Sequence, residues 1–385
     1  MDTTRPRQPL GQSIASTGVA VALHVLCSSR VRGENQADYK YDNYSEEHGR
    51  IQVETHSAYL DQTVNSRLTL QGQLVYDGIS GATPTGAPPP IGSKQVPTTK
   101  MDDIRRAENV TANLRLANHT ISPQFAYSKE SDYESIGVAV TDAIEFNQKN
   151  TTLVLGISHD FDRVMPSFWT SSKPKDTTDF LIGVNQLLDP KTVLTVNFTF
   201  STSDGYLADP YKGVRFDGYP DPTAIFPEKR PGYKTEEIGF VSLTHFFDRL
   251  NGSAEVSYRL YHDSFDILSH TVAAQWYQKL GKHLILSPMF RFTDQSAASF
   301  YGVRFPGDPS DPASPVPIPN YYSADYRLSS LQTFTYGLQA SVIITSWLWV
   351  DAAYTRYEMV GNDNSTPASA YPKANVLTAG VRLWW

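Results

Sequence analysis

One short segment of the chain carries residue types that could do hydrolytic chemistry. His262 and Ser264 are two residues apart, so an imidazole and a hydroxyl would fall on one side of an extended strand. A base beside a hydroxyl is the minimum for nucleophilic catalysis. The sequence has no nucleophile elbow, phosphate loop, haem-attachment pair or two-histidine zinc helix. We therefore predict no catalytic residue, no metal site and no cofactor, and we do not expect an enzyme.

A second set of residues could act on a solute through charge. If the chain forms strands with alternating faces, ten charged side chains share the polar face: Lys40, Asp42, Glu54, Asp77, Arg115, Glu255, Arg259, Arg291, Asp351 and Arg382. The strongest candidates are Arg115, Glu255, Arg259, Arg291, Asp351 and Arg382. Forked arginine donors can hold anionic groups, and facing rows of opposite charge can orient a solute. Alternatively, these charges pair with one another and stiffen the wall.

The elements that must position these charges are strands with one apolar and one polar face. In the last eleven residues, Leu377, Ala379, Val381, Leu383 and Trp385 fall on one face, whereas Thr378, Gly380 and Arg382 fall on the other. Similar alternation predicts about sixteen strands: 37–46, 50–62, 65–77, 103–117, 120–129, 133–146, 150–160, 176–187, 190–204, 233–247, 250–263, 265–280, 283–297, 330–344, 347–361 and 373–385. The strand at 233–247 fits poorly, because Phe240 and Phe246 have the opposite parity from Val241 and Leu243, so we expect a bulge or a wrong boundary there.

The connections between these strands alternate in length. Those after even-numbered strands are tight, whereas the connections after odd-numbered strands include every long one: 78–102, 161–175, 205–232, 298–329 and 362–372. Short periplasmic turns and long extracellular loops are typical of outer-membrane barrels. We therefore predict an all-β protein, a transmembrane antiparallel up-and-down β-barrel with both termini in the periplasm. At about sixteen strands, its lumen would be wide enough to hold water.

Composition agrees with a barrel and excludes other classes. No stretch approaches the roughly 20 apolar residues of a membrane helix, whereas 40% hydrophobic residues and 22 Tyr suit strands with one lipid-facing side. A net charge of -7 gives no basic stripe for nucleic acid. Cys27 is the only cysteine, so disulfides within the chain are excluded. A soluble β-sandwich or propeller remains as the alternative, but tight turns alternating with long loops disfavour it.

The N-terminal segment resembles a secretory signal peptide. Arg5 and Arg7 precede an apolar run from Ile14 to Leu26, and Ser29 marks the expected cleavage site. We divide the chain into a signal peptide at 1–29, a short periplasmic segment at 30–36 and a barrel at 37–385. A disordered tail is the alternative for the first segment, whose apolar core is interrupted by polar residues.

Three loops are distinctive in composition. Residues 78–102 and 305–320 are too rich in Pro and Gly for regular structure, so they either fold inward as a constriction or remain solvated at the surface, which we favour. Loop 205–232 combines aromatic side chains with carboxylates that could grip a sugar or a cation. Interfacial anchoring explains many of those aromatic residues without a ligand.

Several longer segments carry a family resemblance: Asp77–Ala87, Glu130–Tyr133, Phe146–Thr152, Gln186–Pro190, Gly205–Lys212, Tyr261–Phe265 and Tyr357–Met359. They resemble an uncharacterised family of bacterial outer-membrane β-barrels catalogued as a domain of unknown function, over about residues 37–385. The resemblance implies a porin-like barrel but no substrate and no catalytic residues. It also implies neighbours among exported redox components, including flavin-transferase and thioredoxin-like proteins.

Three hypotheses for function follow. The first is a porin-like channel for small hydrophilic solutes or ions in the bacterial outer membrane. The second is a scaffold or conduit for an exported redox or assembly system with a periplasmic or lipoprotein partner. The third is a hydrolase, since His262 and Ser264 resemble the arrangement of outer-membrane phospholipases, although position 276 is Trp where an orienting Asn is expected. Expected partners are outer-membrane lipid and, through the last strand ending at Trp385, the barrel-assembly machinery, and no nucleic acid.

Overall fold

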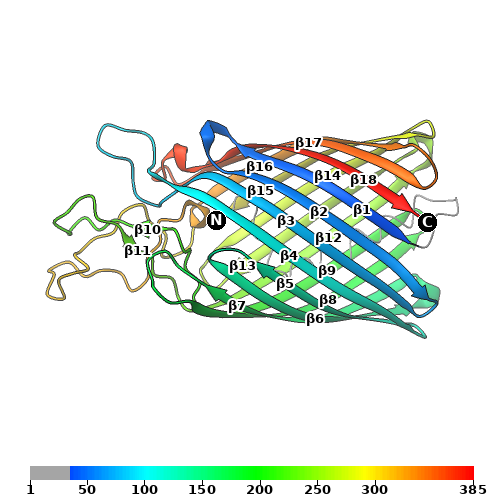
Figure 1. Ribbon diagram of the computed structural model, residues 1–385, viewed down its shortest axis with the longest axis horizontal. Coiled ribbons are helices and arrows are strands. Elements are labelled where there is room, and N and C mark those ends of the chain that lie inside the picture. Colours follow the sequence, from blue (N-terminus) through cyan, green and yellow to red (C-terminus); the bar gives the residue numbers. More distant parts are fainter. Residues whose placement is uncertain (1–34) are drawn as a thin grey trace.

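The alternating segments pair into one closed sheet. A computed structural model, which describes residues 35–385, contains an antiparallel barrel of sixteen strands, so the predicted fold class is confirmed (Figure 1). The strands are β1 (Gln36–Glu46), β2 (Gln52–Asn65), β3 (Leu68–Pro84), β4 (Thr98–Leu116), β5 (His119–Lys129), β6 (Tyr133–Phe146), β7 (Thr151–Val164), β8 (Lys173–Asp189), β9 (Thr192–Gly205), β12 (Tyr233–Phe247), β13 (Gly252–Asp263), β14 (Leu268–Leu280), β15 (Leu284–Gln295), β16 (Leu331–Ile343), β17 (Leu348–Gly361) and β18 (Lys373–Trp384). The predicted signal peptide at 1–29 lies outside the described residues.

Closure joins the two ends of the described chain. Strand β1 pairs with β2 on one side and with β18 on the other, in a register that sets Gln36 opposite Trp384 and Glu46 opposite Ala374. Each strand of the barrel therefore has a partner along both edges. Pairing along both edges is what a sheet in lipid needs, because no water is present there to bond unpaired backbone groups.

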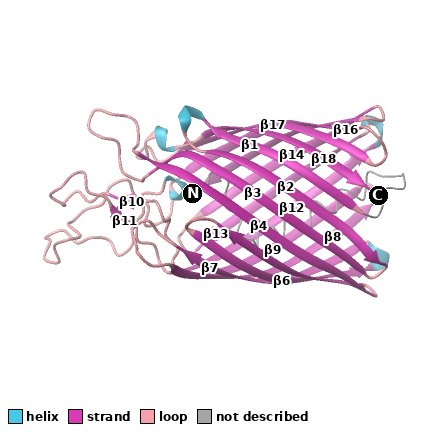
Figure 2. Ribbon diagram, viewed as in Figure 1, coloured by secondary structure: helices cyan, strands magenta, loops and turns pink. Residues whose placement is uncertain are grey.

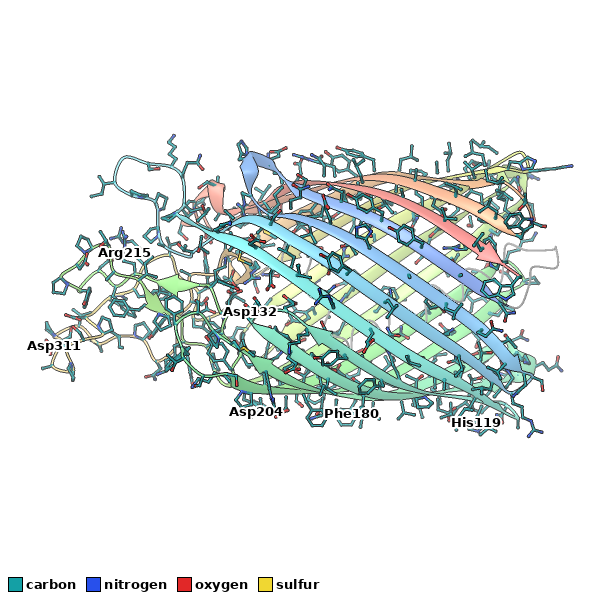
Figure 3. The ribbon with its side chains drawn as sticks, in the orientation of Figure 1. His119, Asp132, Phe180, Asp204, Arg215 and Asp311 are labelled. Atoms are coloured by element: carbon teal, nitrogen blue, oxygen red, sulfur yellow. The ribbon has the colours of Figure 1, made fainter. Side chains whose placement is uncertain are left out.

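The two faces of the sheet differ in polarity as the alternation predicts. On β3, Leu74 is 61% exposed on the outside, whereas Asp77, three residues further along the strand on the inner face, is buried. Phe180 on β8 projects from the outer surface (Figure 3), where it continues a belt of exposed apolar side chains that includes Ile182 and Phe198. An exposed apolar belt of this extent around a barrel is the surface that lipid covers. Within residues 35–385, no helix combines the length and apolarity needed to cross a membrane.

Short and long connections lie at opposite ends of the barrel. The tight turns, such as those joining β8 to β9 and β14 to β15, lie at the end that also holds the last residue, and the long loops emerge at the other end (Figure 2). We call these the turn end and the loop end. The long loops are 85–97, 165–172, 206–232, 296–330 and 362–372. Two of them contain short elements: β10 (Gly213–Val214), which pairs with β11 (Phe226–Pro227), and the 3₁₀ helix η4 (Tyr326–Leu328).

Several expected boundaries were wrong at the loop end. Residues 78–84 and 98–102 were expected in a loop, but they extend β3 and β4, which stay paired as far as Pro84 and Thr98. Gly81 adopts a φ of 108°, where its missing side chain lets the carbonyl of Arg50 come close. Gly and Pro were taken as signs of a loop, but here they occur where paired strands reach the rim.

Strand β12 has no bulge, contrary to expectation. It pairs without interruption with both β9 and β13, whereas register shifts occur at the ends of β2 and β8. Phe240 and Phe246 alternate with the outward-facing Val241 and Leu243, so they face the lumen. The parity was misread because the inner face was assumed to be polar throughout.

Candidate functional site: the lumen wall and its loop cap

All six sequence-predicted charges of the lumen lie at inward positions. Arg115, Glu255, Arg259, Arg291, Asp351 and Arg382 each alternate with outward-facing neighbours on β4, β13, β15, β17 and β18. Of the ten charges predicted to face the lumen, Glu54 was assigned to the wrong face. It is exposed on the outside of β2, because Leu60, His56 and Glu54 share one parity and Leu60 belongs to the apolar belt. Thr55 takes the inward position and donates to Asp77 at 2.5 Å.

Part of this set stiffens the wall. The Arg382 Nε lies 3.1 Å from the Asp38 Oδ1 on the neighbouring strand β1. Asp77 accepts from Arg105 Nη2 at 2.6 Å, and Asp351 accepts from the Ser341 hydroxyl. These charges bind neighbouring side chains in the sheet, as expected if they stiffen the wall rather than contact a solute.

Arg259 and Arg291 differ from the paired charges. Arg259 lies opposite Thr271 on β14, and Arg291 lies opposite Ala273 of the same strand, so both guanidinium groups project from one patch of the inner wall. Arg259 stands 5.4 Å from the ring centre of Tyr261. Among residues 35–385, no carboxylate forms an ion pair with either arginine. Two neighbouring guanidinium groups without carboxylates form a positive patch that can attract anions.

A patch of opposite charge lies on another part of the ring. Asp160 and Asp162 on β7 and Asp179 on β8 face inward and are buried, with Lys175 of β8 beside them. In ring order, β9 and β12 separate this acidic patch from β13, which carries Arg259. Sequence reasoning missed these carboxylates: Asp162 lies beyond the predicted strand end at residue 160, and the inward parity of Asp160 and Asp179 within their predicted strands was not assigned. The signal was present, since Ser158, Asp160 and Asp162 continue one parity.

The long loops fold into a cap over the loop end. Segment 206–214 leaves β9 and follows the rim to β3: Tyr206 N donates to Pro174 O at 2.9 Å, Ser167 N donates to Pro210 O at 3.1 Å, and Gly213 N donates to Thr85 O at 2.8 Å. Lys212, which is 2% exposed, donates from its ammonium to the Thr83 hydroxyl at 3.0 Å.

A second long loop, 296–330 between β15 and β16, meets this segment. Arg327 in η4 bonds Asp209 of segment 206–214, and its carbonyl accepts from Gln295 of β15 at 2.9 Å. The Arg230 guanidinium contacts Glu228 at 2.8 Å and Asp325 at 2.9 Å. We call Asp209, Lys212, Glu228, Arg230, Asp325 and Arg327 the cap cluster; it holds three acidic and three basic groups.

Further contacts join the remaining loops to the cap. Tyr371 in loop 362–372 is hydrogen-bonded to Ser329 at 2.8 Å, and Val96 N in loop 85–97 donates to Ser369 Oγ at 3.1 Å. Beyond the cap, Phe216, Phe305 and Val214 form a small apolar core in the projecting loops. The Pro-rich tip of loop 296–330, which includes Asp311 at the far left of Figure 3, is exposed to solvent. The sequence favoured this solvated arrangement over an inward constriction. The loops thus form one joined structure at the loop end.

The cap cluster contains equal numbers of acidic and basic groups, and burial together with these charges strongly shifts the pKa of Asp325. Burial opposes ionisation of Asp325, which is 1% exposed, but the charge and hydrogen bonds of Arg327 outweigh burial. The pKa of the Asp325 carboxyl therefore lies far below its usual range. Asp325 is ionised at neutral pH and depends on its two arginines.

The arrangement at His262 and Ser264 does not form a catalytic pair. His262 faces outward on β13, with its Nδ1 3.6 Å from the Glu237 carboxylate. The Ser264 hydroxyl instead accepts from Thr235 N at 3.0 Å. No hydrogen bond joins the imidazole and the hydroxyl among the described residues, so the base does not contact the nucleophile.

Three carboxylates at the rim are close enough to share a cation. Asp103, Glu130 and Asp132 each offer an oxygen within 4.8 Å of the others. Asp103 also accepts from the Ser131 hydroxyl at 2.8 Å. Such hydrogen-bonded acidic groups are common without a metal, so the arrangement by itself assigns no site.

Comparison with known proteins gives one family match. The profile of a family described as "Protein of unknown function (DUF3570)" matches residues 13–174 and 168–372. No protein with a curated function matches the chain.

Solved barrels resemble the structure at low sequence identity. CdiB from Acinetobacter baumannii is 6% identical with a TM-score of 0.53, over 91% of this chain and 60% of that chain. The siderophore receptor PirA from Pseudomonas aeruginosa is 11% identical with a TM-score of 0.45, over 92% of this chain and 62% of the receptor. A loop L8 deletion mutant of OmpT, an outer membrane protein of Vibrio cholerae, is 9% identical with a TM-score of 0.45, over 91% of this chain and 98% of the mutant. The likeness concerns the fold alone, and it rests on CdiB, whose TM-score exceeds 0.5.

Proposed function

This chain belongs to the DUF3570 family, whose description assigns no activity, and we propose that it is an outer-membrane channel for small hydrophilic solutes or ions. The family match agrees with the resemblance found in the sequence. The barrel sits in the outer membrane with its turn end toward the periplasm and its loop end outside, as short turns and long loops are oriented in such barrels.

The observation that carries the proposal is the pattern of charge on the inner wall. Arg259 and Arg291 project inward without carboxylate partners, whereas Asp160, Asp162 and Asp179 line a separate part of the ring. Charges that only stiffened the wall would be paired, as Arg382 is with Asp38. Separated patches of opposite sign produce a field across the lumen, which orients and selects charged solutes.

The loop cap adds control over entry. Because segments 206–214 and 322–331 meet over the loop end, a solute must pass beside them or wait until they separate. The channel is therefore narrow at the loop end. Its conductance depends on the cap cluster as well as on the lumen wall.

Planar bilayers test the proposal directly. The purified full-length protein should give discrete conductance steps, and Arg259→Ala and Arg291→Ala should each shift ion selectivity toward cations, because each removes an unpaired positive charge. Arg356→Ala is the matched control, since Arg356 is paired with Glu358 on the outer face and should leave selectivity unchanged.

Two results would overturn the channel. One is silence at every voltage in both the native protein and a variant with a loosened cap, such as Asp325→Asn. The other is a pore whose ion selectivity is the same in Arg259→Ala and Arg291→Ala as in the native protein. Both arginines would then have only a structural role.

A further inference from the structure

Two arginines on the inner wall have guanidinium groups that are open to the lumen. Arg259 on β13 and Arg291 on β15 each lie nearer the loop end of their strand than its turn end. In the part of the chain that the structure describes, neither guanidinium donates a hydrogen bond or forms an ion pair, and none of their nitrogens is a buried atom without a partner. Their N–H groups are therefore accessible and can donate to a solute.

The register of the strands brings these two arginines to one place. Arg259 lies opposite Thr271 on β14, and Arg291 lies opposite Ala273, two residues further along the same strand. Since one strand separates them, their Cα atoms are roughly 12 Å apart at a strand spacing of about 4.8 Å. Side chains on the concave face of a barrel converge, so both guanidinium groups can contact one solute that lies over β14.

Hydroxyl groups lie beside the two arginines. Thr271 and Thr293 are opposite each other on β14 and β15, with their hydroxyl oxygens 3.0 Å apart. One hydroxyl of this pair donates to the other, which keeps its own proton for a ligand. Thr335 lies opposite Arg291 on β16. The patch therefore offers O–H donors next to the guanidinium groups.

Acidic side chains are absent from the patch itself. The inward positions at its centre are those of four adjacent strands, namely 257–261 of β13, 269–273 of β14, 289–293 of β15 and 333–337 of β16. None of these positions holds Asp or Glu. A solute over β14 thus meets two positive charges before it meets a negative one.

The acidic residues at the edge of the patch bind other groups or lie further away. Glu236 and Asp263 both contact the ammonium of Lys234, at 2.8 and 3.0 Å. The negative charge of Glu236 acts on Arg259 less strongly than the positive charge of Arg291 does. Glu255 is four residues from Arg259 on β13, about 13 Å along the strand. These three carboxylates leave the guanidinium groups available to an anion.

Tyr261 holds Arg259 in position. Its ring centre lies 5.4 Å from the guanidinium carbon. The Tyr261 hydroxyl donates to Asp263 at 2.6 Å and accepts from Lys234 at 2.8 Å, which fixes the ring. A guanidinium group that rests against a fixed ring loses less conformational freedom when it binds an anion.

We propose that Arg259 and Arg291 form a binding site for a small oxyanion of the phosphate class with two negative charges. Two guanidinium groups match the charge of such a dianion, and their forked donors, with the Thr271–Thr293 pair, match its several oxygens. A chloride ion has no such set of oxygens to bind. The role of the site in transport rests on the proposed channel, whereas the binding itself can be measured without conduction.

Isothermal titration of the folded full-length protein in detergent with sodium phosphate, at mildly alkaline pH where phosphate carries two charges, tests the site. The native protein should bind one phosphate per barrel. Arg259→Ala and Arg291→Ala should each weaken binding about tenfold or more, because each removes charge-assisted hydrogen bonds. Arg259→Lys keeps the charge but loses the forked donors, so it should also bind more weakly than the native protein.

Arg115→Ala is the matched control. Arg115 also faces inward, but it lies on β4, on the far side of the ring from β13. Its replacement removes the same charge from the lumen wall without touching the patch, so phosphate binding should equal that of the native protein. Circular dichroism establishes that each variant has folded.

Three outcomes decide the proposal. Native protein that gives no more heat with phosphate than with sodium chloride at equal ionic strength would overturn the site, even if the barrel conducts. Equal weakening by Arg115→Ala and Arg259→Ala would also overturn it, because phosphate would then respond only to the total charge of the lumen. A barrel that binds phosphate through both arginines but stays silent in bilayers would support the site and argue against the channel.

Discussion

Replacing Asp325 with Asn should loosen the loop cap without disturbing the barrel. Asp325 is 1% exposed and accepts from Arg230 at 2.9 Å and from Arg327 Nε at 2.8 Å. Asn preserves the size of the side chain and the cap of η4, where the Arg327 N donates to Asp325 Oδ1 at 3.1 Å. It removes the negative charge, so the cap cluster changes from three acids and three bases to an excess of one positive charge.

The size of the effect follows from the burial of this ion pair. Breaking a buried pair from one side costs about 3–5 kcal/mol. Since roughly 1.4 kcal/mol corresponds to a tenfold change, the opening equilibrium of the cap should rise between about a hundredfold and a few thousandfold. Because the cluster lies outside the strands, this cost falls on the cap alone.

Hydrogen exchange followed by mass spectrometry measures this opening. Peptides covering 206–214 and 322–331 should exchange faster by that factor in Asp325→Asn, while peptides from β8 stay protected. Asp311→Asn, in the exposed tip of the same loop, is the control and should exchange like the native protein. Unchanged exchange in both cap peptides of Asp325→Asn would refute the argument that this carboxylate holds the two loops together.

Two further predictions concern pH and the lipid-facing surface. Because Arg327 holds the pKa of Asp325 below its ordinary 3.8, the ionised carboxylate stabilises the cap above about that pH. This stability should be lost as pH falls below 3.8, so the open fraction in bilayer recordings should rise on acidification from pH 5 to pH 3, and a flat profile would contradict it. Leu74→Arg, on the apolar belt, should destabilise the barrel by about 2–4 kcal/mol in lipid, whereas Gln73→Arg on the lumen side should have little effect. Urea unfolding in vesicles measures both, and equal losses would argue against a lipid-covered belt.

The barrel was predictable because its information is local. On β18, apolar and polar residues alternate from Leu377 to Leu383, so the sequence of this strand alone predicts which side chains face outward. The partner strand need not be known. The same rule placed Arg259 and Arg291 on the inner wall. It failed for Glu54, because β2 has few apolar residues near the loop end to set the parity.

The cap was not predictable from alternation. Asp209 and Arg327 are far apart in the sequence and lie in segments without a regular period, so nothing local indicates that they meet. Likewise, Asp160 looks like any polar strand residue in the sequence. Only the pairing of β7 with β6 and β8 shows that it lies over Gly137 and beside Asp179.

The seam between β1 and β18 has a consequence for how the chain acquires its structure. The register that sets Tyr39 opposite Val381 joins residues from the two ends of the barrel sequence, so no shorter part of the chain can form it. Until β18 arrives, β1 exposes a row of unpaired amide and carbonyl groups, which is the kind of edge that recruits other strands. Assembly must therefore protect an incomplete sheet up to its last step, and a substitution that weakens the seam should slow maturation and favour aggregation before it lowers the stability of the finished barrel.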